Sequence, residues 1–197
     1  ARKVTILGAT GSVGRATLDL IERTPEGAFE IVALTANTQA DELAQLAIRT
    51  GARFCAVAAP EAGSALEAAL KGTAIRSGAG PDAICEAARL SADWVMAAIV
   101  GAAGLPPTLE AVKRGAAVAF ANKEALVCAG DLFMRAARDA GARLLPVDSE
   151  HNAIFQAFDE RQRDRVRRII LTASGGPFRS WTLEQMGQAS PAQAVAH

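Results

Sequence analysis

The sequence predicts an α/β fold with a doubly wound parallel β-sheet. Over residues 1–147, short runs rich in β-branched residues alternate with stretches whose apolar residues recur at helical spacing. One run, residues 93–100, is apolar on both faces, which is typical of a central parallel strand covered by helices on both sides. Ligands of such sheets bind beyond the carboxyl ends of the strands, so segments that follow predicted strands are the candidate sites.

Each predicted element has a local signal. Strands are expected where β-branched or aromatic residues lie between glycine or polar turns, and helices where apolar residues recur every three or four positions. Pro81 and Pro107 suit first helical turns, whereas Gly51, Gly115 and Gly141 suit helix ends. The expected elements in chain order are strand 3–7, helix 13–21, strand 29–35, helix 41–49, strand 53–58, helix 61–70, strand 74–77, helix 81–89, strand 93–100, helix 107–114, strand 116–120, helix 122–139 and strand 143–147.

The alternation stops after Val147. We expect a helix over 149–157, a charged connector over 159–168 and a strand over 168–173. So few residues do not easily enclose a hydrophobic core of their own. The sequence therefore predicts one domain over 1–147 and the incomplete start of a second over 148–197, as a fragment of a longer protein.

Composition excludes several classes of protein. Half of the 197 residues are apolar, and 21 basic residues balance 21 acidic ones, which excludes disorder and argues against a nucleic-acid partner. Three well-separated cysteines without a CxxC motif favour a reducing, cytoplasmic compartment. The longest apolar stretch, 94–105, is shorter than the roughly 20 residues that span a membrane, and no signal peptide is visible.

The motif GATGSVG (8–14) lies between the first predicted strand and the first predicted helix, which is the setting of a dinucleotide fingerprint. Its glycines permit a tight turn, close approach of a pyrophosphate and close helix–strand packing. The phosphates are expected on the amides of Thr10 to Val13, at the positive end of the helix. The alternative is a tight turn without a ligand.

The segment after the second strand bears on the choice of cofactor. An acidic residue there would bind the ribose 2′-hydroxyl of NAD, but LTANTQ (34–39) contains none. Asn37, Thr38 and Gln39 are neutral and would tolerate a 2′-phosphate, which favours NADP. The alternative is an ordinary polar loop.

Two further motifs follow predicted strands. In ANKEAL (121–126), Asn122 suits a helix cap and Glu124 the first turn, while Lys123 is placed to meet an anionic or carbonyl substrate. In PVDSEHN (146–152), an extended backbone would put Asp148 and Glu150 on one face, where two carboxylates suit Mg²⁺ or Mn²⁺. The alternative for the second motif is a helix cap formed by Asp148 or Ser149.

The motif TASGGPF (172–178) combines a hydroxyl with two glycines and resembles an anion-binding turn; the alternative is a hinge. The arginine-rich run at 161–168 is interleaved with acids and contains no aromatic residue, so a solvated connector is favoured over a nucleic-acid site.

Taken in order, GATGSVG, VMAAIVGAAGLPPTLEAV, ANKEALV, LLPVDSEHNAIFQ and SGGPF resemble the 1-deoxy-D-xylulose 5-phosphate reductoisomerase family over essentially the whole chain. The resemblance implies a Rossmann-like NADPH-binding domain followed by the start of an α+β catalytic domain. It also implies a cytoplasmic homodimer that makes 2-C-methyl-D-erythritol 4-phosphate from a phosphorylated sugar, with NADPH and Mg²⁺ or Mn²⁺, in the non-mevalonate isoprenoid pathway.

The resemblance assigns roles to single residues. Contacts to NADPH are implied for Thr10, Gly11, Ser12, Val13, Asn37, Asn122 and Glu124. Contacts to substrate are implied for Lys123, Ser149, Ser174 and His197, and metal ligands for Asp148 and Glu150. Many family members carry a basic residue where this chain has Thr38.

The implied reaction is a rearrangement to an aldehyde followed by reduction with hydride, with Lys123, Asp148 and Glu150 as catalytic residues. The family continues beyond the position of His197 with an active-site loop, a third carboxylate ligand and a helical domain, so the chain alone is expected to be inactive. The alternatives are another NADP-dependent semialdehyde or sugar dehydrogenase, and a nucleotide-binding fragment without catalysis.

Overall fold

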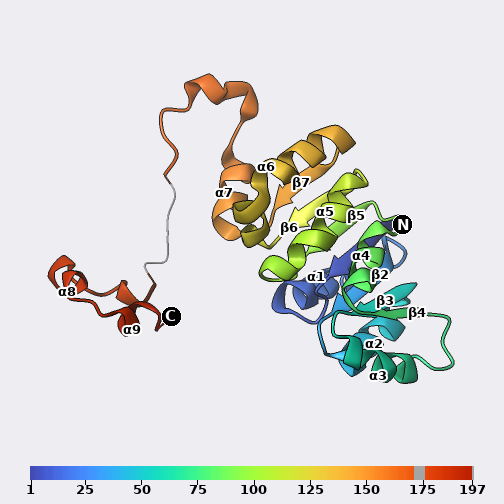
Figure 1. The fold of residues 1–197 in the computed structure, drawn as a ribbon. Helices are drawn as coiled ribbons and strands as arrows, with labels where there is room; N and C mark the ends of the chain where they lie inside the picture. The colour runs from blue at the N-terminus through green and yellow to red at the C-terminus, as the bar shows by residue number, and fades with distance from the viewer. Residues whose placement is uncertain (171–175, 197) are drawn as a thin grey trace. The chain divides into compact units, whose positions relative to one another are not determined.

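The fold is an open parallel β-sheet with helices on both faces, followed by a string of short helices (Figure 1). The computed structural model describes residues 1–170 and 176–196. By its internal contacts the chain divides into a first unit, Ala1–Asp148, and a second unit, Ser149–His197. None of the helices in the described part of the chain is long and apolar enough to cross a membrane.

Seven strands form the sheet in the order β4-β3-β2-β1-β5-β6-β7, and every neighbouring pair is parallel. This order confirms the predicted doubly wound α/β fold, because the chain proceeds outward from β1 on one side and from β5 on the other. The strands are β1 (Arg2–Leu7), β2 (Phe29–Ala36), β3 (Phe54–Val57), β4 (Arg76–Ala79), β5 (Trp94–Ala97), β6 (Ala117–Phe120) and β7 (Arg143–Pro146).

Helices cover both faces of the sheet. Leu18, Leu43 and Leu66 bring the first three helices against one face, and Ala87, Val112 and Phe133 bring the next three against the other. The helices of the first unit are α1 (Ser12–Glu22), α2 (Ala40–Thr50), α3 (Gly63–Ala69), α4 (Pro81–Arg89), α5 (Leu105–Lys113) and α6 (Lys123–Ala140), with 3₁₀ turns at Pro60–Ala62 and Ala102–Gly104.

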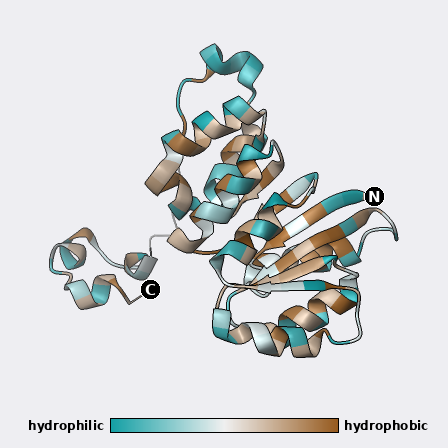
Figure 2. Ribbon diagram, turned by 45° about the vertical axis from the view of Figure 1, so that its right-hand side comes forward, coloured by the Kyte–Doolittle hydropathy of each residue, from teal (hydrophilic) through white to brown (hydrophobic). Residues whose placement is uncertain are grey.

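The hydrophobic core lies between the sheet and these helices, so the strands of the first unit are mainly apolar and charged residues lie on the outer helix surfaces (Figure 2). Phe54, Phe133, Ile6, Leu34 and Val95 are almost completely buried. Burial of this kind is the main favourable contribution to folding.

The described residues of the second unit form short elements. They are α7 (Ser149–Ala157), a 3₁₀ helix (Glu160–Arg165), a 3₁₀ turn (Gly176–Phe178), α8 (Leu183–Gly187) and α9 (Pro191–Ala194). The predicted helix over 149–157 is confirmed. The predicted strand over 168–173 is wrong for 168–170, which have no regular structure, and the rest of it lies outside the described residues.

Most predicted boundaries differ from the observed ones by one or two residues; the strand predicted over 74–77, for example, is Arg76–Ala79. Two differences are larger. The fifth strand ends at Ala97 rather than at residue 100, because the carbonyl groups of Ile99 and Gly101 bond to a side chain instead of the sheet. The charged connector contains the 3₁₀ helix Glu160–Arg165, which is hydrophilic throughout (Figure 2).

Candidate active site

The carboxyl ends of β1 and β5 mark the point where the strand order reverses. Leu7 and Ala97, the last residues of these strands, are paired across the sheet. Ligands of doubly wound sheets bind in the crevice outside such a reversal. Gly8 follows β1 with a φ of +89°, and a Cβ there would lie 2.8 Å from the carbonyl oxygen of Ala98, so glycine is required at this position.

The loop over residues 8–14 leaves the start of α1 open. Gly11 is the N-cap residue, no side chain caps the helix, and its first turn contains no acidic residue. Backbone N–H groups at an uncapped helix start form a site for an anion. A Cβ on Gly14 would lie 2.2 Å from the oxygen of Gly8, so this glycine is what allows the helix to start so close to the strand.

The end of β2 holds this loop in place. The hydroxyl oxygen of Thr35 accepts a hydrogen bond from the amide of Gly8 at 3.0 Å, and its carbonyl accepts one from Ala9 at 2.7 Å. The Thr10 hydroxyl, which is almost buried, donates to Gln39 Oε1 at 2.6 Å. Sequence analysis missed the role of Thr35, because a threonine inside a strand carries no signal beyond β-propensity.

Arg15 is a second missed residue. Its Nε donates to the carbonyl of Thr10 at 2.9 Å, and its Nη2 lies 2.8 Å from Glu42 of α2. More than half of its side chain is exposed, so Arg15 is a solvent-accessible cation beside the loop over residues 8–14. An arginine in the first turn of the fingerprint helix is the signal that could have identified it. Asn37, directly after β2, is exposed, and its carbonyl accepts from Ala59 at 3.1 Å.

Asn122 links two loops at the same edge of the sheet. Its Nδ2 donates to the carbonyls of Ile99 at 2.6 Å and Gly101 at 2.8 Å, and its Oδ1 accepts from the amide of Ala125 at 3.3 Å. The predicted cap of α6 is therefore confirmed. The side chain is only 2% exposed, so Asn122 fixes the position of the loop after β5 relative to the start of α6.

Lys123 and Asp148 follow neighbouring strands and form an ion pair. Lys123 Nζ lies 3.1 Å from Asp148 Oδ2, and the two side chains are 59% and 12% exposed. The pair therefore places an exposed cation and a largely enclosed carboxylate beside each other beyond the ends of β6 and β7. Glu124 is exposed in the first turn of α6, as predicted.

The predicted geometry of the two carboxylates is wrong in one respect. Asp148 lies in a bend, whereas Ser149 begins α7 and Glu150 is in its first turn, so the segment is not extended. Asp148 and Ser149 are residue types that favour the start of a helix, so the backbone turns into α7 here. It does not continue in the extended conformation that would put Asp148 and Glu150 on one face. Within residues 1–170 and 176–196, no group of three or more His, Cys, Asp or Glu side chains is placed to hold a metal. Ser174 and His197 lie outside the described residues.

Known proteins resemble this chain along its whole length. A family model described as 1-deoxy-D-xylulose 5-phosphate reductoisomerase matches residues 4–130, and one described as the C-terminal domain of that enzyme matches residues 144–197. Curated relatives with this name from Rhodopseudomonas palustris (strain BisB18) and Zymomonas mobilis subsp. mobilis (strain ATCC 31821 / ZM4 / CP4) are 58% and 54% identical over 196 residues. The matches cover 100% of this chain but 48% and 50% of these proteins, so the chain spans about half the length of its relatives.

Solved structures agree with this match. The 1-deoxy-D-xylulose 5-phosphate reductoisomerase from Zymomonas mobilis in complex with NADPH superimposes with a TM-score of 0.92 at 54% identity, over 100% of this chain and 52% of that one. A DOX-P reductoisomerase in complex with NADPH, fosmidomycin and magnesium gives a TM-score of 0.87 at 37% identity, over 100% of this chain and 51% of that one.

Proposed function

Because the chain belongs to the 1-deoxy-D-xylulose 5-phosphate reductoisomerase family, we propose that it acts, as part of a longer protein, in converting 1-deoxy-D-xylulose 5-phosphate into 2-C-methyl-D-erythritol 4-phosphate. The observation that carries this proposal is the open start of α1 at the reversal of strand order, at the same end of the sheet as the Lys123–Asp148 pair. The relatives crystallised with NADPH and with magnesium support it.

The first unit is the NADPH-binding part of the proposal. Thr10, Gly11, Ser12 and Val13 would hold the phosphates, since the uncapped start of α1 leaves backbone N–H groups for them. Asn37 is exposed after β2 and would lie near the adenosine ribose. Glu124 is exposed and would contact the cofactor directly. Asn122 is buried, and its side-chain amide would hold the loop after β5 against which the cofactor rests.

Asp148 and Glu150 would hold the divalent cation. Two carboxylates provide the hard oxygen ligands that Mg²⁺ and Mn²⁺ prefer. In the structure Asp148 forms an ion pair with the ammonium of Lys123, so its position already suits a positive charge. When bound, NADPH supplies the hydride and the metal polarises the substrate oxygens. Lys123 would turn from Asp148 to the substrate and stabilise its negative charge. Ser149, Ser174 and His197 would complete the substrate contacts.

The rest of the proposal concerns the whole protein. Residues 1–147 would form the NADPH-binding domain and residues 148–197 the beginning of the catalytic domain. We further propose a homodimer in the cytoplasm that acts in isoprenoid precursor synthesis and has neither a membrane nor a nucleic-acid partner. The even balance of 21 basic and 21 acidic residues supports the last point.

A cofactor titration and a turnover assay test this function. The 197-residue chain is titrated with NADPH and with NADH by fluorescence, and tighter binding of NADPH is expected. A longer form of the protein carrying Asp148→Asn should lose turnover while its NADPH affinity stays nearly unchanged, because that carboxylate belongs to the metal and substrate. Equal affinity for both cofactors would remove the NADP assignment, and normal turnover of the variant would leave Asp148 with a structural role.

A further inference from the structure

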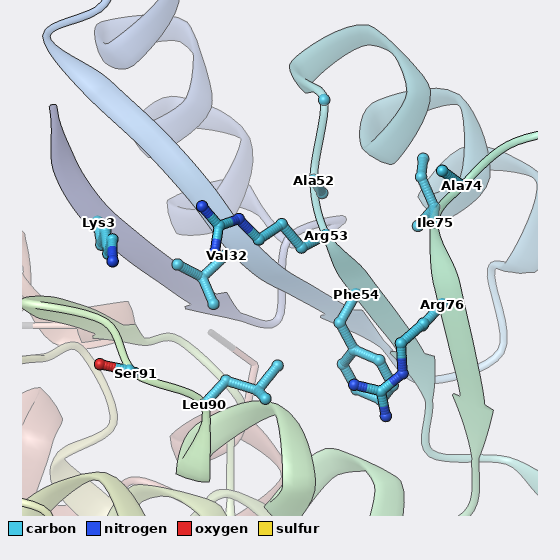
Figure 3. A pocket seen from close by; sticks show the side chains of 11 residues that line it. Lys3, Val32, Ala52, Arg53, Phe54, Ala74, Ile75, Arg76, Leu90 and Ser91 are labelled. Atoms are coloured by element: carbon cyan, nitrogen blue, oxygen red, sulfur yellow. The ribbon is translucent and has the colours of Figure 1, made fainter.

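A cavity of about 740 Å³ lies in the first unit, at the amino-terminal ends of the strands, whereas the candidate active site lies at their carboxyl ends (Figure 3). Lys3, Phe54 and Arg76 lie at the beginning of β1, β3 and β4, and Leu90 and Ser91 lie between α4 and β5. The fingerprint loop follows the other end of β1. This cavity is therefore distinct from the proposed NADPH site, and its volume is that of a small-molecule pocket.

The floor of the cavity is apolar. Leu90 points toward Val32 and Phe54, which are 4% and 1% exposed and so belong to the hydrophobic core (Figure 3). The guanidinium of Arg76 lies 5.3 Å from the centre of the Phe54 ring. A flat apolar group entering here would cover Leu90 and Ile75, which line the cavity and are only partly buried.

The charged groups that line the cavity are all cations: Lys3, Arg53 and Arg76. Arg53 pairs with Glu30, and Arg76 pairs with Glu86 at 2.5 Å, so carboxylates outside the lining hold both guanidinium groups. These arginine side chains are 62% and 66% exposed. A guanidinium has five N–H donors, and one carboxylate uses at most two of them, so donors remain for a second anion.

Lys3 differs from the two arginines. Its backbone amide donates to Asp93 at 2.8 Å, but its ammonium has no acidic partner within the part of the chain that the structure describes. An apolar floor with cations around it matches a molecule with a flat apolar body and one negative charge. We propose that this cavity is a binding site for a small aromatic carboxylate, separate from the cofactor site.

The test uses 2-naphthoate as the probe and the 197-residue chain with saturating NADPH. Amide shifts in ¹H–¹⁵N spectra are expected to cluster at residues 3, 52–54, 75–76 and 90–91. Lys3→Gln should weaken binding roughly three- to tenfold, because it removes a lining cation that, unlike Arg53 and Arg76, has no acidic partner among the described residues. Leu90→Glu should abolish binding, since it places a carboxylate in the cavity.

Glu86→Gln should change the affinity for the probe in the opposite direction. It removes the carboxylate that competes for Arg76, so the probe should bind more tightly than to the unmodified chain. A loss of fold would not produce this gain. Lys71→Gln and Leu20→Glu are matched controls on exposed residues outside the cavity, and they should leave the affinity unchanged.

Three results would overturn the proposal. The first is no shift up to millimolar probe, and the second is a set of shifts confined to residues outside the cavity lining. The third is an unchanged affinity in Lys3→Gln and Glu86→Gln. Because the probe is measured with NADPH already present, failure of this site leaves the NADPH titration, and therefore the proposed function, untouched.

Discussion

Asn122 and Lys123 are neighbours in the chain, but the fold uses their side chains differently. The amide of Asn122 is buried and bonded to three backbone groups, whereas the ammonium of Lys123 is mostly exposed and reaches Asp148 across 3.1 Å. From the sequence, an asparagine and a lysine that follow a parallel strand are both candidates for contact with a ligand. Burial shows which of the two is a structural link and which remains movable.

Replacing Asn122 by alanine should lower the free energy of unfolding by about 2–3 kcal/mol, because the carbonyls of Ile99 and Gly101 lose their buried donor and α6 loses its cap. Urea denaturation followed by circular dichroism measures the loss. Asn37→Ala is the control, since this exposed side chain should change stability by less than about 0.5 kcal/mol. Equal effects of the two substitutions would show that the three hydrogen bonds contribute little.

The three cysteines should react with iodoacetamide in the order Cys128, Cys85, Cys55. Cys128 is exposed, Cys85 is half-buried and Cys55 is buried. Burial raises the pKa of the Cys55 thiol to about 11 and also raises the pKa of Cys85. At pH 8 the thiol of Cys55 is therefore almost entirely protonated and unreactive.

Peptide mass spectrometry of timed samples identifies the modified residue. Cys55 should be labelled only after urea is added, which is the internal control for its chemical competence. Labelling of Cys55 in the native protein at the rate of Cys128 would mean that β3 opens readily.

The role of a residue was predictable from sequence where the local backbone accepts only one or a few residue types. The glycines of 8–14 and the cap at Asn122 fall in this class. Thr35 and Arg15 were missed because their partners, Gly8 and Glu42, lie 27 positions away in the chain. The extended geometry assumed for Asp148 and Glu150 was wrong because helix initiation at Ser149 decides the backbone there.

At the scale of elements, the junction of β1 and α1 depends on two glycines with different functions. Gly14 has no room for a side chain, since a Cβ would lie 2.2 Å from the Gly8 oxygen. Gly11 has an ordinary φ of −77°, and its added Cβ would have its nearest neighbour at 3.4 Å. Gly14 is therefore required for packing of the helix against the strand, whereas Gly11 leaves space in front of the helix.

Gly14→Ala should therefore lower the melting temperature and abolish NADPH binding, because the strand–helix junction must shift. Gly11→Ala should keep the melting temperature within a few degrees but weaken NADPH binding roughly tenfold or more, since its methyl group would occupy the approach of the pyrophosphate. Differential scanning fluorimetry and fluorescence titration separate the two effects. Normal NADPH affinity in Gly11→Ala would place the pyrophosphate elsewhere.

Element order was predictable throughout the first unit because turn residues and periodicity agree there. Boundaries were less predictable where long-range bonds decide them. The fifth strand stops at Ala97 because the Asn122 amide takes the carbonyls of Ile99 and Gly101, and that competition is absent from any local window of sequence. The strand expected over 168–173 has β-branched residues, but within residues 1–170 and 176–196 no strand pairs with 168–170.

At the scale of the whole molecule, the two units differ in how much they bury. The first unit has a core on each face of a seven-stranded sheet. In the described residues of the second unit, none is buried, and apolar side chains such as Phe155 and Leu183 are 53% and 87% exposed. Hydrophobic burial is the dominant favourable term in folding, so the second unit should have little stability of its own.

Hydrogen exchange should reveal this difference directly. Amides of β1, β5 and β6 should exchange only on global unfolding of the first unit, because they are bonded in the centre of the sheet. Amides of α7, α8 and α9 should exchange far faster, since isolated helices of nine residues or fewer are marginal in water. The capping boxes at Thr182 and Ser190 should slow this exchange only slightly.

The intact relative from Zymomonas mobilis provides the control, because this chain covers 52% of its structure. If packing against the rest of the protein stabilises the second unit, the segments equivalent to α7 and α8 should be protected there and unprotected here. Saturating NADPH should slow exchange in the loop over residues 8–14 of this chain without protecting α8 or α9, because only the first unit is proposed to bind it. Uniform protection of both units in the 197-residue chain would contradict this account, since it would require buried surface in the second unit that its exposed side chains do not provide.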